Sequence, residues 1–300
     1  MNQFSAWMAA ARPRTLPLAL SSSLMGSFAA LQDGRFRWWV FGLSLLTTLF
    51  LQILSNLAND YGDSVNGADN DQRVGPVRAV QSGAIALTSM RRAVVLLSLL
   101  ALTSGVVLIT VGLGFDRWLP WLIFLGVGLM AIAAAIFYTA GSRPYGYKGY
   151  GDLFVFLFFG ITAVVGTYYL HARTASFGVL LPAATIGFLS TAVLNLNNMR
   201  DVEGDALAGK RTLVVAFGAQ FARRYHYSIV VLAVISLVVW NLIHNAGIWQ
   251  YLFLLLTPII ALHLRRVATI KPPALLDPQL RVLAFATLLV VLLFGLGLHL

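Results

Sequence analysis

Two short acidic stretches contain most of the side chains in this sequence that are suited to metal or phosphate chemistry. Seven of the 11 carboxylates fall within residues 56–71 and 197–205. In each stretch, an asparagine is followed by two acids at intervals of three or four residues, which would place all three side chains on one face of a helix. These side chains are Asn56, Asp60 and Asp63 in the first stretch and Asn197, Asp201 and Asp205 in the second.

The donor atoms in these stretches are carboxylate and amide oxygens, which suit Mg²⁺ or Mn²⁺ better than Zn²⁺. The chain has no cysteine, and its five histidines show no ligand spacing. Acids at the C-terminal end of a helix oppose the helix dipole, so positive charge must compensate them. Mg²⁺ commonly binds one or two carboxylates together with phosphate oxygens. The pattern predicts two metal sites that hold a diphosphate between them, and a structural network of ion pairs with arginine is the alternative.

The composition of the chain shows which elements must position these acids. Hydrophobic residues make up 59% of the sequence, charged residues make up 11%, and the mean hydropathy is +0.80. Several apolar runs approach the ~20 residues that cross a bilayer as a helix. The sequence therefore predicts an all-α, polytopic membrane protein with a single domain over residues 1–300. The expected spans are 16–32, 38–60, 92–113, 118–138, 152–170, 178–199, 225–243, 248–268 and 282–299.

The distribution of basic residues supports this number of spans. With the N-terminus in the cytoplasm, 17 of the 21 Lys and Arg residues fall in cytoplasmic segments, as the positive-inside rule expects. The net charge of +10 is therefore interpreted as a basic membrane face, and no nucleic-acid partner is expected. Both acidic stretches lie at cytoplasmic ends of spans. Residues 1–15 are expected to form an amphipathic segment at the lipid interface, with Phe4, Trp7 and Met8 on one face.

Two motifs in these stretches resemble those of the UbiA-type intramembrane prenyltransferases. Residues 59–63 (NDYGD) match the family's NDxxD-like motif, and residues 201–205 (DVEGD) match its DxxxD motif. The wider family often has a third Asp four residues after the first motif; here that position is Gly67, and the role of the next acid, Asp69, stays open. Four longer stretches resemble the bacterial members that prenylate 1,4-dihydroxy-2-naphthoate in menaquinone synthesis. They are residues 12–17, 52–63, 138–149 and 192–201.

The resemblance implies a fold of nine transmembrane helices around a central cavity, with a polar cap of cytoplasmic loops. It implies transfer of a polyprenyl group from polyprenyl diphosphate to 1,4-dihydroxy-2-naphthoate, with loss of CO₂ and diphosphate, giving demethylmenaquinone. It also implies a multi-pass protein of the bacterial cytoplasmic (inner) membrane, in contact with membrane lipid, whose active site faces the cytoplasm.

The resemblance further implies roles for individual residues in this reaction. The metal ligands, for Mg²⁺ with Mn²⁺ as a possible substitute, would be Asp60, Asp63, Asp201 and Asp205. Side chains that complete or orient the metal shells would be Asn56, Asn59, Asn197 and Asn198. Arg78 would bind phosphate oxygens, with Arg143, Lys148, Lys210 and Arg211 as further candidates. The aromatic acceptor would lie against Tyr138, Tyr145 and Tyr147. The phenylalanine-rich residues 154–159 are expected to pack against lipid, and a gate for the prenyl chain is the alternative.

Two other functions remain open from the residues alone. One is a UbiA-type transferase for another aromatic acceptor, such as 4-hydroxybenzoate. The other, from a different functional class, is a cation-coupled transporter. A transporter of that kind carries its acids near the middle of the membrane, often on interrupted helices. The expected position of both acidic stretches at span ends argues against a transporter.

Overall fold

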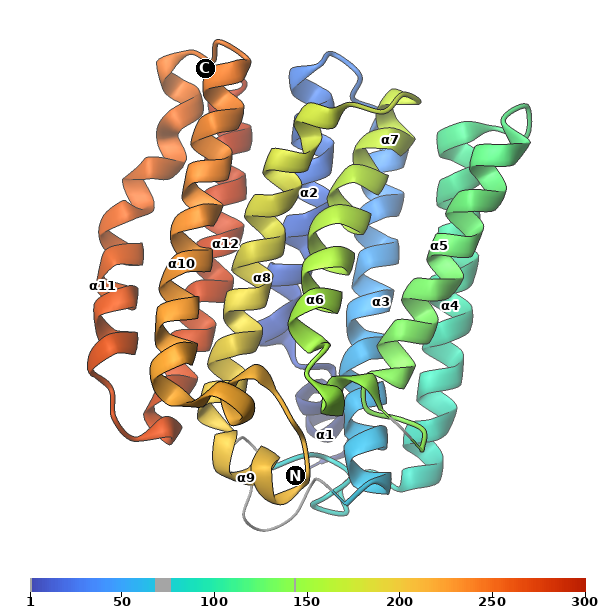
Figure 1. The fold of residues 1–300 in the computed structure, drawn as a ribbon. Helices are drawn as coiled ribbons and strands as arrows, with labels where there is room; N and C mark the ends of the chain where they lie inside the picture. Colours follow the sequence, from blue (N-terminus) through green and yellow to red (C-terminus); the bar gives the residue numbers. More distant parts are fainter. Residues whose placement is uncertain (1, 68–76, 143) are drawn as a thin grey trace.

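The computed structural model describes residues 2–67, 77–142 and 144–300, and this part of the chain is entirely helical apart from turns and connections. Eight of its helical segments have at least 18 residues and are apolar enough to cross a membrane. A further helix, α2, has 17 residues and packs within the same bundle against α3 and α12 (Figure 1). The prediction of an all-α, multi-pass membrane protein is therefore confirmed, and the described residues form about nine spanning segments.

The spanning segments follow one another along the chain, and some of them consist of two or three consecutive helical elements. In chain order they are α2 (Leu16–Gln32); α3 (Trp38–Val65); α4 (Leu87–Leu113); α5 (Trp118–Phe137); α6 (Gly151–Val155) continued by η3 (Phe156–Val165) and α7 (Gly166–Ala172); η4 (Phe177–Val179) with α8 (Leu180–Arg200); α10 (Leu213–Ile243); η5 (Ile248–Leu256) with α11 (Thr257–Thr269); and η6 (Pro273–Leu276) with α12 (Asp277–Gly297).

Three helices extend further toward the acidic end of the bundle than hydropathy predicts. Helix α3 continues to Val65 instead of stopping at residue 60, so Asp63 lies within it. Helix α4 begins at Leu87 instead of residue 92, and α10 begins at Leu213 instead of residue 225. The first turns of α10 are set off by a kink at Gly218, whose φ of 82° favours glycine. Hydropathy detects only the apolar part of a helix, and these helices have polar ends.

Close packing between α8 and η3 depends on two glycines that face each other. A Cβ atom on Gly160 would lie 2.6 Å from the carbonyl oxygen of Ala183, and one on Gly187 would lie 2.7 Å from the ring of Phe156. Small residues allow backbones to approach closely in membrane proteins, where van der Waals packing drives helix association. Segment η3 is a π-helix, a conformation that often occurs at functional sites.

The N-terminal helix α1 (Gln3–Ala11) lies beside α3 at the end of the bundle that carries the acidic motifs (Figure 1). Phe4 and Met8 are exposed, whereas Trp7 packs against a buried cluster on the bundle. The three side chains therefore do not share one exposed face, because α1 is docked on protein along one side. The location of residues 1–15 at the lipid interface stays a prediction.

The second acidic motif differs from the single helical stripe that its spacing predicts. Helix α8 ends at Arg200, and Asp201 leaves the helical conformation with φ −97° and ψ 12°. A separate short helix, α9 (Val202–Leu207), then carries Asp205. The amide of Asp205 still donates to the carbonyl oxygen of Asp201 at 2.8 Å, so the two residues stay close across the break.

Candidate active site

A polar cavity of about 210 Å³ lies between the ends of the bundle helices that carry the two acidic motifs. Carboxylates of both motifs reach its wall, so the structure brings together two stretches that are far apart in the sequence. Five basic side chains also reach this wall. The charged lining residues are Asp63, Asp201, Asp205, Arg12, Arg14, Arg78, Lys210 and Arg281. With more positive than negative charge, the described lining favours an anionic ligand.

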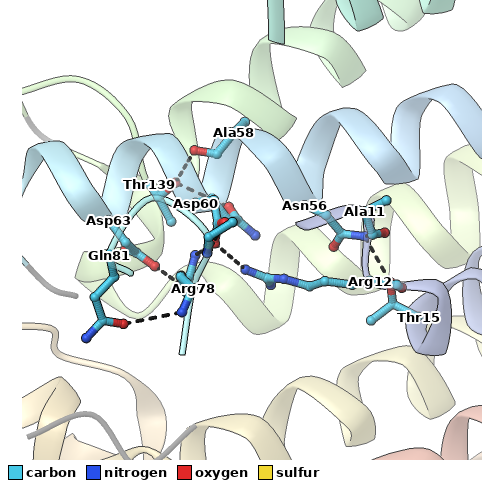
Figure 2. A network of polar contacts seen from close by, with 12 residues as sticks. Ala11, Arg12, Thr15, Asn56, Ala58, Asp60, Asp63, Arg78, Gln81 and Thr139 are labelled. Atoms are coloured by element: carbon cyan, nitrogen blue, oxygen red, sulfur yellow. Dashed lines mark hydrogen bonds and ion pairs between the residues drawn. The ribbon is translucent and has the colours of Figure 1, made fainter. Parts of the chain in front are cut away.

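Asp60 is the most enclosed carboxylate of the first motif. Its Oδ1 atom accepts from Arg12 at 3.3 Å and from Arg78 at 3.2 Å, and its Oδ2 accepts from the amide of Ala79 at 3.3 Å. Figure 2 shows the two guanidinium groups converging on this carboxylate from different parts of the chain. Asp60 is 1% exposed and is not among the residues that line the polar cavity. Its position suggests that it orients Arg12 and Arg78, and its role as a metal ligand stays a prediction.

Asp63 lies one turn further along α3 and does reach the polar cavity. Its Oδ2 accepts from Arg78 at 2.6 Å, and its Oδ1 accepts from the hydroxyl of Tyr147 at 2.7 Å. Arg78 therefore bridges both acids of the first motif with its two terminal nitrogens. A charge-assisted pair of this kind fixes the geometry of both partners.

Lys210 connects the two motifs. Its Nζ atom lies 3.2 Å from Oδ1 of Asp63 and 3.5 Å from Oδ1 of Asp205. The ammonium also lies 4.7 Å from the centre of the Tyr147 ring, within the range of a cation–π contact. The backbone assists this arrangement, because the amide of Arg211 donates to the carbonyl oxygen of Tyr147 at 2.8 Å. The connection after α9 is thereby tied to the connection before α6.

Asp201 is held by the residue that precedes it. Arg200 donates from Nε to Oδ1 of Asp201 at 2.8 Å and from Nη2 to Oδ2 at 2.6 Å. The same Nη2 donates to the side-chain oxygen of Asn197 at 2.8 Å, and Nη1 donates to Asp277 at 2.6 Å. Arg200 is only 2% exposed. This buried guanidinium therefore sets the orientation of the first acid of the second motif.

Among the described residues, Asp205 has the weakest charge compensation of the acids on the cavity wall. Burial raises the pKa of its carboxyl to about 6, against the opposing effect of Lys210, and the negative charges of Asp201 and Asp63 raise it further. A buried carboxylate with one cationic neighbour at 3.5 Å is electrostatically unfavourable, so additional positive charge at this position stabilises it.

An apolar cavity of about 340 Å³ adjoins the polar one and extends between the spanning segments. The two cavities share several wall residues, among them Asn59, Tyr138 and Phe159. Phe154 and Phe158 also line the apolar cavity, so the favoured expectation of packing against lipid is wrong for these two side chains. The junction places an apolar channel directly behind a cationic site with acidic motifs.

The structure distributes the predicted site residues unevenly. Those that line the polar cavity, besides the acids and basic residues already named, are Asn59, Tyr138, Tyr147, Asn197 and Asn198. Tyr145 instead lines the apolar cavity, where its hydroxyl donates to the carbonyl oxygen of Ala134 at 2.9 Å. Burial raises the pKa of Tyr145 above its usual value, so this side chain is a neutral hydrogen-bond donor.

Asn56 and Lys148 are two further predicted residues that do not line the polar cavity. Asn56 donates to the carbonyl oxygen of Ala11 at 2.9 Å and to the hydroxyl of Thr15 at 3.0 Å, as Figure 2 shows, and therefore anchors the N-terminal segment. Lys148 is exposed at the end of η2 (Tyr145–Lys148) and lines neither cavity. Arg143 lies outside the described residues, as does Asp69.

Sequence patterns do not identify five charged residues that the structure places at the site, because their positions in the sequence fit a role in membrane topology equally well. These residues are Arg12, Arg14, Arg200, Asp277 and Arg281. Arg12 has a positive φ of 49°, which is uncommon for a residue other than glycine. The available signal was the pair of arginines around Pro13, immediately before the first span.

The carboxylate and amide oxygens on the cavity wall suit a divalent cation that also binds phosphate oxygens of a ligand. Within the described ranges, no three carboxylate or histidine side chains converge closely enough to form a metal site by themselves. The wall offers Asp63 from one side and Asp201 and Asp205 from the other, with amides from Asn59 and Asn197. One or two carboxylates with phosphate oxygens is a common arrangement for Mg²⁺.

Comparisons with known proteins identify the family of the chain. Residues 19–277 match the model of the UbiA prenyltransferase family. The chain is 42% identical over 300 residues to the 1,4-dihydroxy-2-naphthoate octaprenyltransferase of Escherichia coli, covering 100% of this chain and 97% of that one. It is also 42% identical to the enzyme of the same name from Haemophilus influenzae, covering 97% and 95% of the two chains.

Solved structures with a similar fold come from archaea. The apo structure of a UbiA homolog from Aeropyrum pernix superposes with a TM-score of 0.67 at 17% identity, covering 95% of each chain. A UbiA homolog from Archaeoglobus fulgidus bound to GPP and Mg²⁺ superposes with a TM-score of 0.59 at 16% identity, covering 98% of this chain and 100% of that one. At these identities, the similarity establishes the fold.

Proposed function

Because the chain belongs to the UbiA prenyltransferase family, we propose that it transfers a polyprenyl group to 1,4-dihydroxy-2-naphthoate. The two relatives at 42% identity, which carry that activity in their names, support the acceptor. The observation that carries the proposal is the junction of a cationic cavity, lined by both acidic motifs, with an apolar cavity between spanning segments. A polyprenyl diphosphate has the same division into an anionic head and an apolar tail.

The diphosphate would lie in the polar cavity, where Arg78 and Lys210 approach from two sides of the first motif. Mg²⁺ bound there, with Mn²⁺ as a substitute, would neutralise the charge that develops on diphosphate as it leaves. Asp63, Asp201 and Asp205 are the proposed ligands on the cavity wall. Asp60 stays a further candidate ligand. Asn59, Asn197 and Asn198 would orient the ligands or their water molecules.

The prenyl chain would occupy the apolar cavity, which begins at Tyr138 and continues past Phe154 and Phe158. Its reactive carbon would then lie at the junction of the two cavities. Aromatic faces stabilise nearby positive charge, so Tyr138 is placed to stabilise a prenyl group that becomes cationic as diphosphate leaves. Exclusion of water by the surrounding helices would protect this electrophile from hydrolysis.

In the proposed reaction, the bond between the prenyl carbon and the diphosphate oxygen breaks. A new carbon–carbon bond forms at the ring carbon that bears the carboxylate, and this carboxylate leaves as CO₂. The direct product is the quinol form of demethylmenaquinone. Tyr138 and Tyr147 line the polar side of the junction and are the proposed walls of the acceptor site. Tyr145, which lines the apolar side, would support Tyr138, because their ring centres are 5.4 Å apart.

The proposed location follows from the same features. The apolar helices make the chain an integral membrane protein. We place it in the bacterial inner membrane with the acidic end toward the cytoplasm, in accordance with the 17 of 21 basic residues expected on that side. In this orientation, the polar cavity is reached from the compartment that supplies a water-soluble acceptor.

An assay with two acceptors tests the proposed function. Purified protein in detergent is incubated with labelled polyprenyl diphosphate, Mg²⁺ and either 1,4-dihydroxy-2-naphthoate or 4-hydroxybenzoate. We expect a prenylated product and CO₂ release only with the naphthoate, and no product when EDTA replaces Mg²⁺. Product formed with 4-hydroxybenzoate alone would reject the acceptor, and metal-independent turnover would reject the metal sites.

A further inference from the structure

Asp277 is a carboxylate that belongs to neither acidic motif, yet it is joined directly to the second one. It is the first residue of α12, and its Oδ1 accepts from Nη1 of Arg200 at 2.6 Å. Its Oδ2 lies 3.5 Å from Nη1 of Arg14 and 3.6 Å from Nη2 of Arg281. Three guanidinium groups from three parts of the chain therefore share this one carboxylate.

Arg200 transmits this contact to the cavity wall. It is buried, and it binds both carboxylate oxygens of Asp201 with two nitrogens, at 2.8 and 2.6 Å. A planar guanidinium that engages both oxygens fixes the plane of the carboxylate, which a lysine ammonium does not do. Each carboxylate oxygen has a second lone pair, so Asp201 can accept these bonds and still offer oxygen to the cavity that it lines.

We propose that Arg200 and Asp277 are positioning residues that orient Asp201 for metal binding, so that α12 takes part in building the second acidic motif. This inference rests on the proposed function in one respect, since it takes Asp201 as a metal ligand. Side chains that hold metal ligands in place typically change metal affinity 10- to 100-fold when they are removed.

The negative charge of Asp277 should favour metal binding at Asp201, as its contact with Arg200 does. Asp277 compensates part of the positive charge of Arg200, which is buried beside the cavity wall. Without that compensation, Arg200 would interact with Asp201 more strongly and would oppose a divalent cation at the same oxygens. Loss of Asp277 should therefore weaken metal binding even though Asp277 is not itself on the cavity wall.

Direct binding of Mn²⁺ to the full-length protein in detergent tests this inference. Free Mn²⁺ is measured by electron paramagnetic resonance, with no prenyl donor or acceptor present, for the wild type, Asp277→Asn, Asp201→Asn and the double variant. We expect Asp277→Asn to weaken Mn²⁺ binding about tenfold. In the Asp201→Asn background, the same change should have no further effect, because Asp277 acts through Asp201. Asp116→Asn, an exposed acid between α4 and α5, is the matched control and should bind like the wild type.

Arg200→Lys is a second, independent variant, which keeps the charge and removes the planar fork. It should also weaken Mn²⁺ binding about tenfold, and it decides the question if Asp277→Asn does not fold. Wild-type affinity in either folded variant overturns the inference, as does an equal loss from Asp277→Asn with and without Asp201. Failure of the wild type to use 1,4-dihydroxy-2-naphthoate rejects only the proposed acceptor, because the Mn²⁺ measurement contains no acceptor.

Discussion

The first acidic motif lies on the last turns of one uninterrupted helix, α3, whereas the second is divided between the end of α8 and the short helix α9. The two motifs also obtain their positive partners differently. Asp60 and Asp63 receive charge from Arg12, Arg78 and Lys210, which are all distant from α3 in the sequence or on connections. Asp201 receives charge from its own neighbour, Arg200.

As a result, the carboxylates differ in how much positive charge lies next to each of them. Asp60 accepts three hydrogen bonds and lies behind the cavity wall. Within the described part of the chain, Asp205 has one cationic neighbour, at 3.5 Å, and its pKa is raised to about 6 by burial. The comparison predicts that Asp205 depends most on a bound cation, while Asp60 mainly organises the arginines.

The largest expected effect tests whether the two motifs act as one site. Asp63→Asn and Asp205→Asn keep the shape of the side chains but remove a charge from opposite sides of the polar cavity. Because both are proposed to hold metal at the leaving diphosphate, each change should lower kcat/KM at least about 100-fold. Turnover of labelled polyprenyl diphosphate measures this, with Asp116→Asn as the control. A variant in either motif that retains more than a tenth of wild-type activity would show that its motif is dispensable.

The next effect concerns stability and separates Asp60 from Asp205. Asp60→Asn takes a partner from two guanidinium groups that are largely enclosed, so it should destabilise the fold by about 3 kcal/mol. Asp205→Asn removes a carboxylate that is ionised at pH 7.5 although burial disfavours its charge in the folded state, so it should leave stability unchanged or higher. Thermal unfolding in detergent at pH 7.5 with EDTA compares the two variants. If Asp205→Asn melts below Asp60→Asn, the ranking of the two acids is wrong.

The smallest effect is a pH dependence that originates at Asp205. Because its folded-state pKa is raised to about 6, the native protein holds this proton more tightly than the unfolded chain does. In the absence of metal, the contribution of Asp205 to folding stability should therefore be largest below about pH 4 and should decrease as the pH rises through about 6. Metal competes with the same proton, so Mn²⁺ affinity should fall about tenfold between pH 7 and pH 5.

Mn²⁺ titrations at several pH values check this prediction. In Asp205→Asn, the competing proton is absent, so the remaining affinity should vary less than about threefold over the same range. An unchanged tenfold dependence in that variant would assign the titration to another group. A flat profile in the wild type would show that burial does not perturb Asp205.

The sequence allowed prediction of the spanning segments, of both acidic motifs and of Arg78, because apolar runs and clustered acids are local properties of the chain. Helix ends were less accurate, because α3, α4 and α10 continue past their apolar parts. The break at Asp201 was missed because spacing alone does not distinguish one helix from two short ones in succession.

Contacts between residues that are distant in the sequence could not be predicted either. Asn56 shares a helical face with Asp60, yet it binds the N-terminal segment, because that segment packs against α3 and presents the carbonyl oxygen of Ala11 and the hydroxyl of Thr15 there. The sequence gives no reason to prefer Lys210 over Lys148 as a site residue, but of these two lysines only Lys210 reaches the polar cavity. Nothing local distinguishes two such lysines.

The order of apolar and charged segments was sufficient to establish a helical membrane protein whose acids gather at its basic end, since hydropathy and charge act along the chain itself. The folded bundle alone decided which charges meet: Arg12 with Asp60, Lys210 with both motifs, and Asp277 with Arg200. It also decided that the polar cavity opens onto an apolar one. These features depend on how helices from distant parts of the sequence pack, and a buried ion pair stabilises a site only when packing brings its two partners into register.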